Sequence, residues 1–306
     1  MRILVIGGTG FIGRHLIARL AGGQHQILVP TRRYGQGREL QLLPTVTLLA
    51  SDVHDDDALD HLVRGCDAVV NLVGILHGNS GRPYGSDFAR AHVHLPQRIA
   101  RACRRLGVRR LLHVSALGAD SSGASMYQRS KGDGEAAIKQ ELADWREGGW
   151  TIFRPSVVFG ADDNFTNMFA RLARWLPLLP LAGAHVRMQP VFVGDVVTAM
   201  LATLGNTHTW GKTYELGGPQ VYTLGEIARL CAGWGGNPRP VLNMPMGLGR
   251  MQAMLFECLP GRPLMSRDNL DSLRSDNICG APIAPELNVV PTGLEAVAPG
   301  YLSPAR

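Results

Sequence analysis

A glycine-rich turn directly after the first apolar run is the feature that most constrains this chain. Residues 3–6 are all apolar, and Gly7, Gly10 and Gly13 follow in the stretch GGTGFIG. A short apolar run predicts a strand buried on both faces, and residues 11–20 then repeat apolar side chains with helical spacing. A strand, a glycine turn and a helix N-terminus together present backbone N–H groups to a pyrophosphate. We expect Gly7 to permit the tight turn, Gly10 to admit the phosphates and Gly13 to let helix and strand pack closely.

Strands and helices alternate through the first half of the chain. Amphipathic stretches such as residues 56–65 and 95–107 separate the apolar runs. This alternation predicts an α/β fold with a doubly wound parallel sheet, whose ligands bind at the carboxyl ends of the strands. The further strands are expected at residues 26–32, 46–53, 67–76, 109–116 and 150–155.

The residues that end these strands are therefore candidates for cofactor contacts. A site for NAD(H) usually has an acid after the second strand, whereas this chain has Arg32 and Arg33 there. Guanidinium groups match a phosphate, so NADP(H) is preferred as cofactor and NAD(H) stays open. After the third strand, Asp52 and Val53 are expected near the adenine. After the fourth strand, the four residues Asn71, Leu72, Val73 and Gly74 are expected on the nicotinamide ribose side.

The stretch SMYQRSK at residues 125–131 contains a second candidate site. Lys131 follows Tyr127 by four positions, so on a helix the two side chains lie on one face. An ammonium beside a phenol favours the phenolate, which predicts a lowered tyrosine pKa and proton exchange near neutral pH. The alternative is a solvated helix face.

Charge and cysteine usage narrow the class of partner. The formal net charge is +6, which favours anionic partners, but no aromatic residues accompany the basic run at residues 101–110, so nucleic acid is not expected.

The five cysteines form no C-x-x-C pair and are expected as reduced thiols. His92 and His94 diverge at a spacing of two residues on a helix, and no metal site is expected. Glycines interrupt the first apolar run too early for a signal peptide, and we expect a cytoplasmic protein.

These motifs together resemble the extended and atypical short-chain dehydrogenase/reductase superfamily, the NAD-dependent epimerase/dehydratase group. The ordered matches are GGTGFIG, SDV, NLVG, HVSALGA, YQRSK, FRPSVVFG and QPVFVGDVVTAM. NLVGIL, VSALGAD and the tail SRDNLDSLRSDNICG are similar to one branch, which contains the nucleotide-binding accessory subunit of respiratory complex I. That branch also resembles a membrane-associated protein of coenzyme Q synthesis. The resemblance implies a Rossmann-type sheet with a smaller C-terminal substrate lobe.

The resemblance also assigns roles to residues. Tyr127 would be the acid/base, Lys131 would hold the nicotinamide ribose, and a serine after the fifth strand would bond the substrate oxygen. In one alignment with the family motif, Ser115 takes that place. In the other alignment Ala116 takes it, and a hydroxyl is missing. The implied cofactor-binding set, beyond the strand ends above, is Gly7, Thr9, Gly10, Phe11, Ile12, Gly13, Ser115, Tyr127, Lys131, Pro155 and Val158.

The alternation of strands and helices ends near residue 160. We expect residues 1–160 to form the NAD(P)-binding domain, with 189–216 returning to it, and 161–188 with 217–306 to form the smaller lobe for substrate or partner. Residues 244–266 are rich in methionine and are flanked by Arg250 and Arg262. They are expected either to close the substrate crevice or to meet a membrane or partner.

Two functions remain open from the sequence. In the first, NADP(H) is a bound ligand beside a membrane redox or quinone-related complex, which places the protein peripherally at the inner face of a membrane. In the second, the protein is an active NADP(H)-dependent oxidoreductase or nucleoside-diphosphate-sugar epimerase that uses Tyr127 and Lys131.

Overall fold

The architecture comes from a computed structural model of the chain. It describes residues 1–258, 261 and 263–303. Arg262, one of the two arginines expected to flank the methionine-rich stretch, lies outside the described residues.

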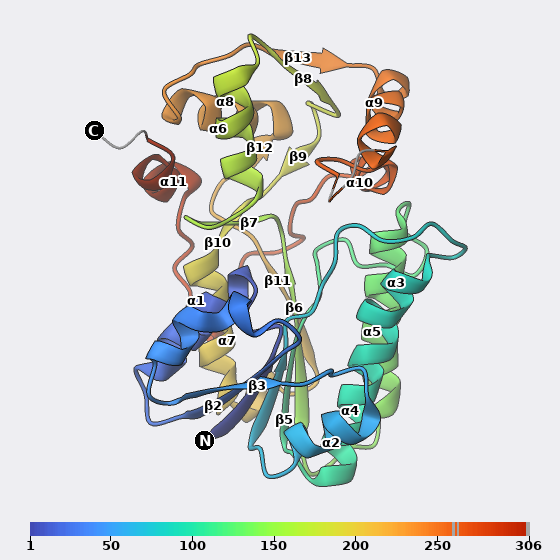
Figure 1. Cartoon of the computed structure of the whole chain (residues 1–306), viewed down its shortest axis with the longest axis vertical. Helices are drawn as coiled ribbons and strands as arrows, with labels where there is room; N and C mark the ends of the chain where they lie inside the picture. Colours follow the sequence, from blue (N-terminus) through green and yellow to red (C-terminus); the bar gives the residue numbers. More distant parts are fainter. Residues whose placement is uncertain (259–260, 262, 304–306) are drawn as a thin grey trace.

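A seven-stranded sheet forms the larger part of the molecule (Figure 1). All its neighbouring strands run parallel, and its order is β3-β2-β1-β4-β5-β6-β11. Successive strands are added on one side of β1 up to β3 and on its other side from β4 onward, so the order reverses between β1 and β4. The predicted doubly wound Rossmann-type fold is confirmed. The strands are β1 (Arg2–Ile6), β2 (Gln26–Thr31), β3 (Val46–Ala50), β4 (Ala68–Asn71), β5 (Arg110–Val114), β6 (Gly149–Pro155) and β11 (Lys212–Leu216).

Several strands are shorter than their apolar runs. β4 ends at Asn71, whereas the run continues to residue 76, and β3 ends at Ala50 rather than at residue 53. The residues beyond each end leave the hydrogen-bonded ladder and form loops at the carboxyl edge of the sheet. The strands predicted from the sequence therefore extend beyond the observed ends of β3 and β4.

Helices cover both faces of the sheet (Figure 1). Because successive strand residues point to opposite faces, Ile3 and Val5 pack with one set of helices and Leu4 and Ile6 with the other. The first face carries α1 (Phe11–Ala21) and α7 (Val193–Leu204). The second face carries α2 (Asp56–Val63), α4 (Leu95–Leu106) and α5 (Met126–Glu141). A short turn of helix, α3 (Ser86–Phe88), and a π-helical segment, Ala89–His94, lead into α4.

The chain leaves the sheet after β6 and later returns to it. It runs through β7 (Val158–Phe159), α6 (Phe165–Trp175), β8 (Leu179–Ala182) and β9 (Arg187–Met188) before β10 (Val191–Phe192). β10 pairs in parallel with β7, α7 then packs against α1, and β11 joins the edge of the sheet beside β6.

A smaller lobe lies above the carboxyl edge of the sheet in Figure 1. Its core contains Phe169, Ile227, Cys231 and Ala298 from α6, α8 (Leu224–Trp234) and α11 (Leu294–Leu302). β13 (Val241–Met244) pairs with β8, and β12 (Tyr222–Thr223) pairs with β9. α9 (Met246–Cys258) and α10 (Arg267–Ser272) complete the lobe. All five cysteines are free. Within the described part of the chain, no helix is both long and apolar enough to cross a membrane.

Candidate functional site

The glycine turn lies where the strand order reverses. Gly7 has a φ of +82°, a backbone conformation that side chains disfavour. A Cβ on Gly13 would lie 2.5 Å from the carbonyl oxygen of Gly8, so only glycine lets α1 pack this closely on the turn. Gly10 is different, because a Cβ there would meet only the Gly7 oxygen, at 3.2 Å. It is the N-cap of α1 and no side chain caps it, an arrangement that suits a phosphate.

The end of β2 presents positive charge. Arg32 and Arg33 are exposed, and the Arg33 N–H donates to the Thr31 hydroxyl at 3.2 Å. Neither guanidinium forms an ion pair with a described residue. Both are therefore available to an anionic ligand.

The loops after β3 and β4 reach the same edge of the sheet. Asp52 accepts the His54 N–H at 3.0 Å and lies 3.7 Å from the Arg90 guanidinium, while Val53 packs on the α2–α4 side of the core. Asn71 is fully buried, and its side chain turns inward rather than toward the edge. Its oxygen accepts the Val73 N–H at 3.1 Å and its amide pairs with Nδ1 of His113 at 3.1 Å. Asn71 thus shapes the loop of Leu72, Val73 and Gly74.

Tyr127 and Lys131 lie on the first turns of α5. Ser125 caps this helix through a capping box with Gln128, which fixes where the helix begins. The Lys131 side chain is 3% exposed, and its ammonium donates to the Val114 carbonyl at 3.2 Å. It lies 6.0 Å from the centre of the Tyr127 ring, and a Cβ on Gly74 would lie 3.3 Å from it. Lys131 is therefore buried between α5 and the loop after β4, and Tyr127 beside it is half-buried, so the pair does not lie on a solvated face.

The pKa of Tyr127 differs from the sequence-based expectation. Burial raises it to about 12, whereas the nearby ammonium was expected to lower it. Burial also lowers the pKa of Lys131, to about 8. The physical reason is that packing removes water from both groups, and at 6.0 Å from the ring the ammonium does not compensate the phenol for that loss.

His92 joins the two walls of this site and was not foreseen as part of it. It is 1% exposed and lies on the π-helical segment. Its Nε2 accepts the Ile75 N–H at 3.0 Å, so Nδ1 carries the proton and donates to the Ser130 hydroxyl at 2.8 Å. Its ring also packs nearly perpendicular to the Tyr127 ring, with centroids 5.5 Å apart. Burial and the nearby Lys131 ammonium hold its pKa far below the usual range. The sequence offered only the pattern AHVH, which does not reveal these partners.

Ser115 is the first residue after β5. Its N–H donates to the Phe153 carbonyl at 2.7 Å, while its hydroxyl is buried and has no partner among the described residues. A buried hydroxyl without a partner is unfavourable unless a ligand or water satisfies it. Ala116 beside it is also buried and offers no hydroxyl.

The remaining predicted residues lie in α1, β6, β7 and the turn before α1. Thr9 lies against Gly37, Phe11 lies against Gly160, and Ile12 packs on the core beneath α1. Pro155 is buried at the end of β6, where its carbonyl accepts the Leu117 N–H at 2.9 Å, and Val158 pairs with Val191.

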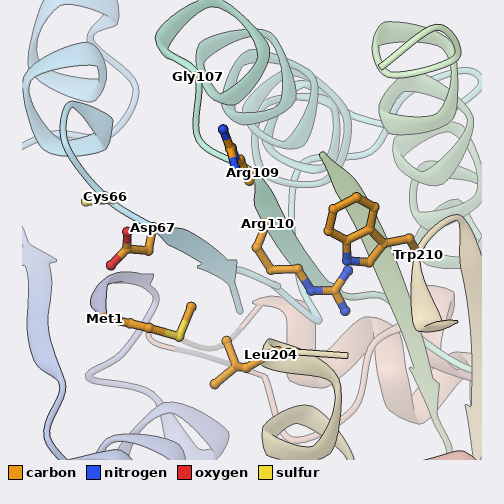
Figure 2. Close-up of a pocket in the computed structure, with 9 residues that line it drawn as sticks. Met1, Cys66, Asp67, Gly107, Arg109, Arg110, Leu204 and Trp210 are labelled. Carbon is orange, nitrogen blue, oxygen red and sulfur yellow. The ribbon is translucent and has the colours of Figure 1, made fainter. Parts of the chain in front are cut away.

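Further cavities lie in the described part of the chain. One, of about 510 Å³, is at the opposite edge of the sheet, where β1, β4 and β5 begin (Figure 2). Its Arg110 is buried and donates to Gly149, Thr151 and Thr209, and burial lowers its pKa to about 10. Another, of about 770 Å³, lies between the start of α5 and α9–α10 and is lined by Met126, among others. In the described part of the chain, no group of three or more His, Cys, Asp or Glu side chains is arranged to hold a metal ion.

The residues at the carboxyl edge fit a dinucleotide. Gly10 leaves room at a helix N-terminus, Arg32 and Arg33 have no ion pair with a described residue, the Lys131 ammonium is buried beside Gly74, and the Ser115 hydroxyl lacks a partner. When bound, such a cofactor supplies hydride transfer at its nicotinamide ring.

Comparison with known families agrees with this geometry. The model of the NAD dependent epimerase/dehydratase family matches residues 3–217. The chain belongs to this family. Nucleotide cofactor binding is a property of the family, and the sequence resemblance is confirmed.

Curated relatives in the family point to one branch. The chain is 29% identical over 299 residues to the mitochondrial NADH dehydrogenase (ubiquinone) 1 alpha subcomplex subunit 9 of Mus musculus, covering 95% of this chain and 77% of that protein. It is 34% identical over 238 residues to the subunit of the same name from Arabidopsis thaliana, covering 74% of this chain and 56% of that one. A ceramide reductase from Caulobacter vibrioides is 28% identical over 205 residues, or 65% of this chain and 60% of that enzyme.

Solved structures share the fold. UDP-glucuronic acid 4-epimerase from Bacillus cereus superposes with a TM-score of 0.70 at 19% identity, and 99% of each chain is covered. Pal from Bacillus thuringiensis gives a TM-score of 0.75 at 15% identity, again over 99% of each chain.

Proposed function

We propose that this protein holds NADP(H) at the carboxyl edge of its sheet, between the glycine turn and α5. The observation that carries the proposal is the buried Lys131 ammonium. It has lost its water, donates to the Val114 carbonyl, forms no ion pair with a described residue, and lies beside Gly74. Ribose hydroxyls placed there would supply the missing acceptors.

Preference for NADP(H) over NAD(H) rests on the end of β2. Arg32 and Arg33 are exposed, and no described carboxylate pairs with them. A 2′-phosphate at this position would receive charge-assisted hydrogen bonds that a 2′-hydroxyl cannot match. Arg32 and Arg33 would therefore both help to bind the nucleotide and select NADP(H) over NAD(H).

We further propose that the nucleotide is held beside a membrane redox or quinone-related system. Relatives named as NADH dehydrogenase (ubiquinone) subunits support this partner. So do exposed apolar side chains on the smaller lobe, here together called the apolar tip. The tip consists of Trp175, Leu178, Leu242, Leu248, Met251, Met254 and Leu255. Arg171 and Arg174 are exposed next to it on α6, an arrangement that favours anionic lipid. The protein would then be cytoplasmic and peripheral at the inner face of the membrane.

Titration of NADPH and NADH, followed by fluorescence, tests the cofactor. Gly10→Val should abolish binding in a folded protein, because a branched side chain takes the space of the phosphates. Gly22→Val is the matched control, since Gly22 ends α1 with a φ of −71° and its Cβ would meet its nearest atom at 3.6 Å. Undiminished NADPH affinity in folded Gly10→Val would contradict the site. Identification of the proteins and lipids that co-purify with the protein tests the proposed membrane partner.

An active enzyme is the second candidate, favoured by the set of Tyr127, Lys131 and Ser115. In this function the Tyr127 hydroxyl exchanges a proton with a carbonyl or alcohol oxygen that the Ser115 hydroxyl bonds, and Lys131 orients the cofactor. The substrate would be a carbonyl compound, an alcohol or a nucleoside-diphosphate sugar.

Tyr127→Phe separates the two candidates. It removes a hydroxyl and should leave NADPH affinity largely intact. Turnover with a panel of carbonyl substrates should fall by about a hundredfold or more in the variant if the protein is an enzyme. If wild type turns over none of the panel, the binding function stands alone.

A further inference from the structure

The tail motif SRDNLDSLRSDNICG contacts both α5 and the loops after β5 and β6, which surround the proposed nucleotide site. We call residues 266–280 the tail strap. Ser266 caps α10, and the chain then runs from the start of α5 to the end of β11, on the side where the smaller lobe faces the sheet. Its contacts are with residues far away in the sequence, so it is held by tertiary structure.

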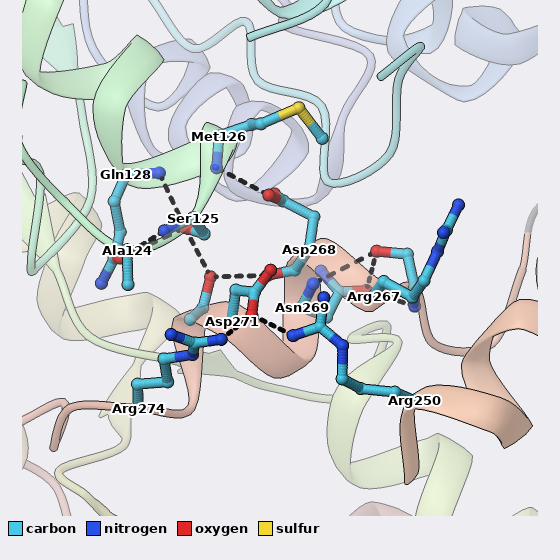
Figure 3. A network of polar contacts seen from close by, with 12 residues as sticks. Ala124, Ser125, Met126, Gln128, Arg250, Arg267, Asp268, Asn269, Asp271 and Arg274 are labelled. Carbon is cyan, nitrogen blue, oxygen red and sulfur yellow. Dashed lines mark hydrogen bonds and ion pairs between the residues drawn. The ribbon is translucent and has the colours of Figure 1, made fainter. Parts of the chain in front are cut away.

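One end of the tail strap holds the first turn of α5. The Asp268 carboxylate accepts the Met126 N–H at 2.6 Å and the Tyr127 N–H at 3.1 Å. The Ser272 hydroxyl donates to Ser125, the N-cap of the same helix, at 2.8 Å. Figure 3 shows Ser125 and Met126 at the start of this helix, with Asp268 beside them. Since the Ser125 hydroxyl already accepts the Gln128 N–H, Asp268 takes the N–H groups of the helix start that lacked a partner. A helix N-terminus is a good place for an anion, and here the anion is supplied by the chain itself.

The other end of the tail strap contacts the loops that follow β5 and β6, across the proposed nucleotide site from α5. Asn277 accepts the Ser156 hydroxyl at 2.6 Å and donates to the Leu117 carbonyl at 3.3 Å, so it links the loops that follow β5 and β6. Its backbone bridges Met188 in the smaller lobe, and the Gly280 N–H donates to Glu215 on β11 at 2.8 Å. The tail strap therefore joins α5, the sheet and the lobe around one space.

Two polar groups of the proposed nucleotide site are buried. Lys131 is 3% exposed and Ser115 is 4% exposed, although both are placed to meet a ligand. Asp268 itself is 8% exposed. A nucleotide with its nicotinamide end at Lys131 must displace part of the enclosure as it enters and leaves.

We propose that the tail strap keeps NADP(H) resident, with Asp268 as a positioning residue that acts through Tyr127 and the first turn of α5. Asp268 sets where Tyr127 and, one turn later, Lys131 stand relative to the nicotinamide ribose. Asn277 closes the opposite wall. This inference rests on the proposed NADP(H) site and adds to it a slow exchange of the nucleotide.

Stopped-flow measurement of NADPH association and dissociation tests the proposal. Asp268→Asn keeps the shape of the side chain and removes its charge, and Asn277→Ala opens the other wall. Each should raise the dissociation rate about tenfold, the effect of losing one hydrogen bond to a charged or buried group, and should raise the association rate as well. Asp271→Asn is the matched control, because Asp271 lies on the same helix but pairs with the exposed Arg250 and Arg274. It should leave both rates near those of wild type.

An increase in both the association rate and the dissociation rate of NADPH would indicate that a barrier to nucleotide entry and release has been lowered. A variant that was only less stable would not bind NADPH faster. Rates in Asp268→Asn and Asn277→Ala equal to those of Asp271→Asn would overturn the proposal. If wild type binds no NADPH, the proposed function fails. Hydrogen exchange of the backbone amides then tests only whether the tail strap caps α5. Exchange at Met126 and Tyr127 should then be faster in Asp268→Asn than in Asp271→Asn, and equal protection in the two variants would refute the capping role.

Discussion

Replacing Lys131 with methionine should stabilise the ligand-free protein while weakening its hold on NADPH. Burial lowers the lysine pKa from 10.5 to about 8, so the folded state disfavours the ammonium. Each pKa unit is worth about 1.4 kcal/mol, which makes the charge destabilising by about 3 kcal/mol below pH 8. Methionine also loses the hydrogen bond to the Val114 carbonyl, worth about 1 kcal/mol. The net expectation is a gain of about 2 kcal/mol in the free energy of unfolding at pH 7.

The sign of the pH dependence follows from the direction of the shift. A lysine whose folded pKa lies below its unfolded pKa binds fewer protons when folded, so wild-type stability should rise as pH increases from about 8 to 10.5. The variant lacks this rise, and the difference between the two proteins should shrink over that window. Other titrating groups are shared by both proteins and cancel in the comparison.

Urea unfolding of both proteins at pH 7 and pH 9.5, with NADPH titration at pH 7, measures both effects. Lys139→Met is the matched control, since Lys139 lies on the same helix and is 42% exposed. It should change neither quantity much. A Lys131→Met protein that is no more stable than wild type and binds NADPH equally well would refute the argument that a buried ammonium is retained for the cofactor.

Three other perturbations test separate parts of the molecule. Arg32→Ala with Arg33→Ala should weaken NADPH binding by about ten- to a hundredfold and leave NADH binding nearly unchanged, and tighter NADH than NADPH binding in wild type would contradict the assignment. Gly13→Ala should lower the free energy of unfolding by about 1–3 kcal/mol, because its Cβ meets backbone at 2.5 Å; an unchanged melting temperature would show that α1 can move away. Leu255→Glu should reduce sedimentation with vesicles containing phosphatidylglycerol, whereas Leu42→Glu, 83% exposed outside the tip, should not; equal sedimentation would exclude the apolar tip as the lipid-binding face.

The sequence by itself determined the class of fold and predicted the edge at which the proposed site lies. Apolar runs ending in glycine, arginine or asparagine are local features, and the rule that strand ends meet at one edge follows from parallel pairing. The capping box at Ser125 and the spacing of Tyr127 and Lys131 are also local, so the sequence placed both residues on one helix.

Tertiary structure alone decided the chemistry inside the site. A pKa depends on how much water a group loses, and that loss at Tyr127 depends on packing by segments distant in the sequence, which is why its pKa rises instead of falling. His92 acquires its role only because Ile75 and Ser130 are brought to its two nitrogens. Asp268 accepts the Met126 N–H at the start of α5, although the two residues are 142 positions apart in the sequence. No periodic pattern encodes such a contact. Sequence patterns record the regular spacing of local structure, whereas burial and long-range hydrogen bonds exist only once the chain has folded.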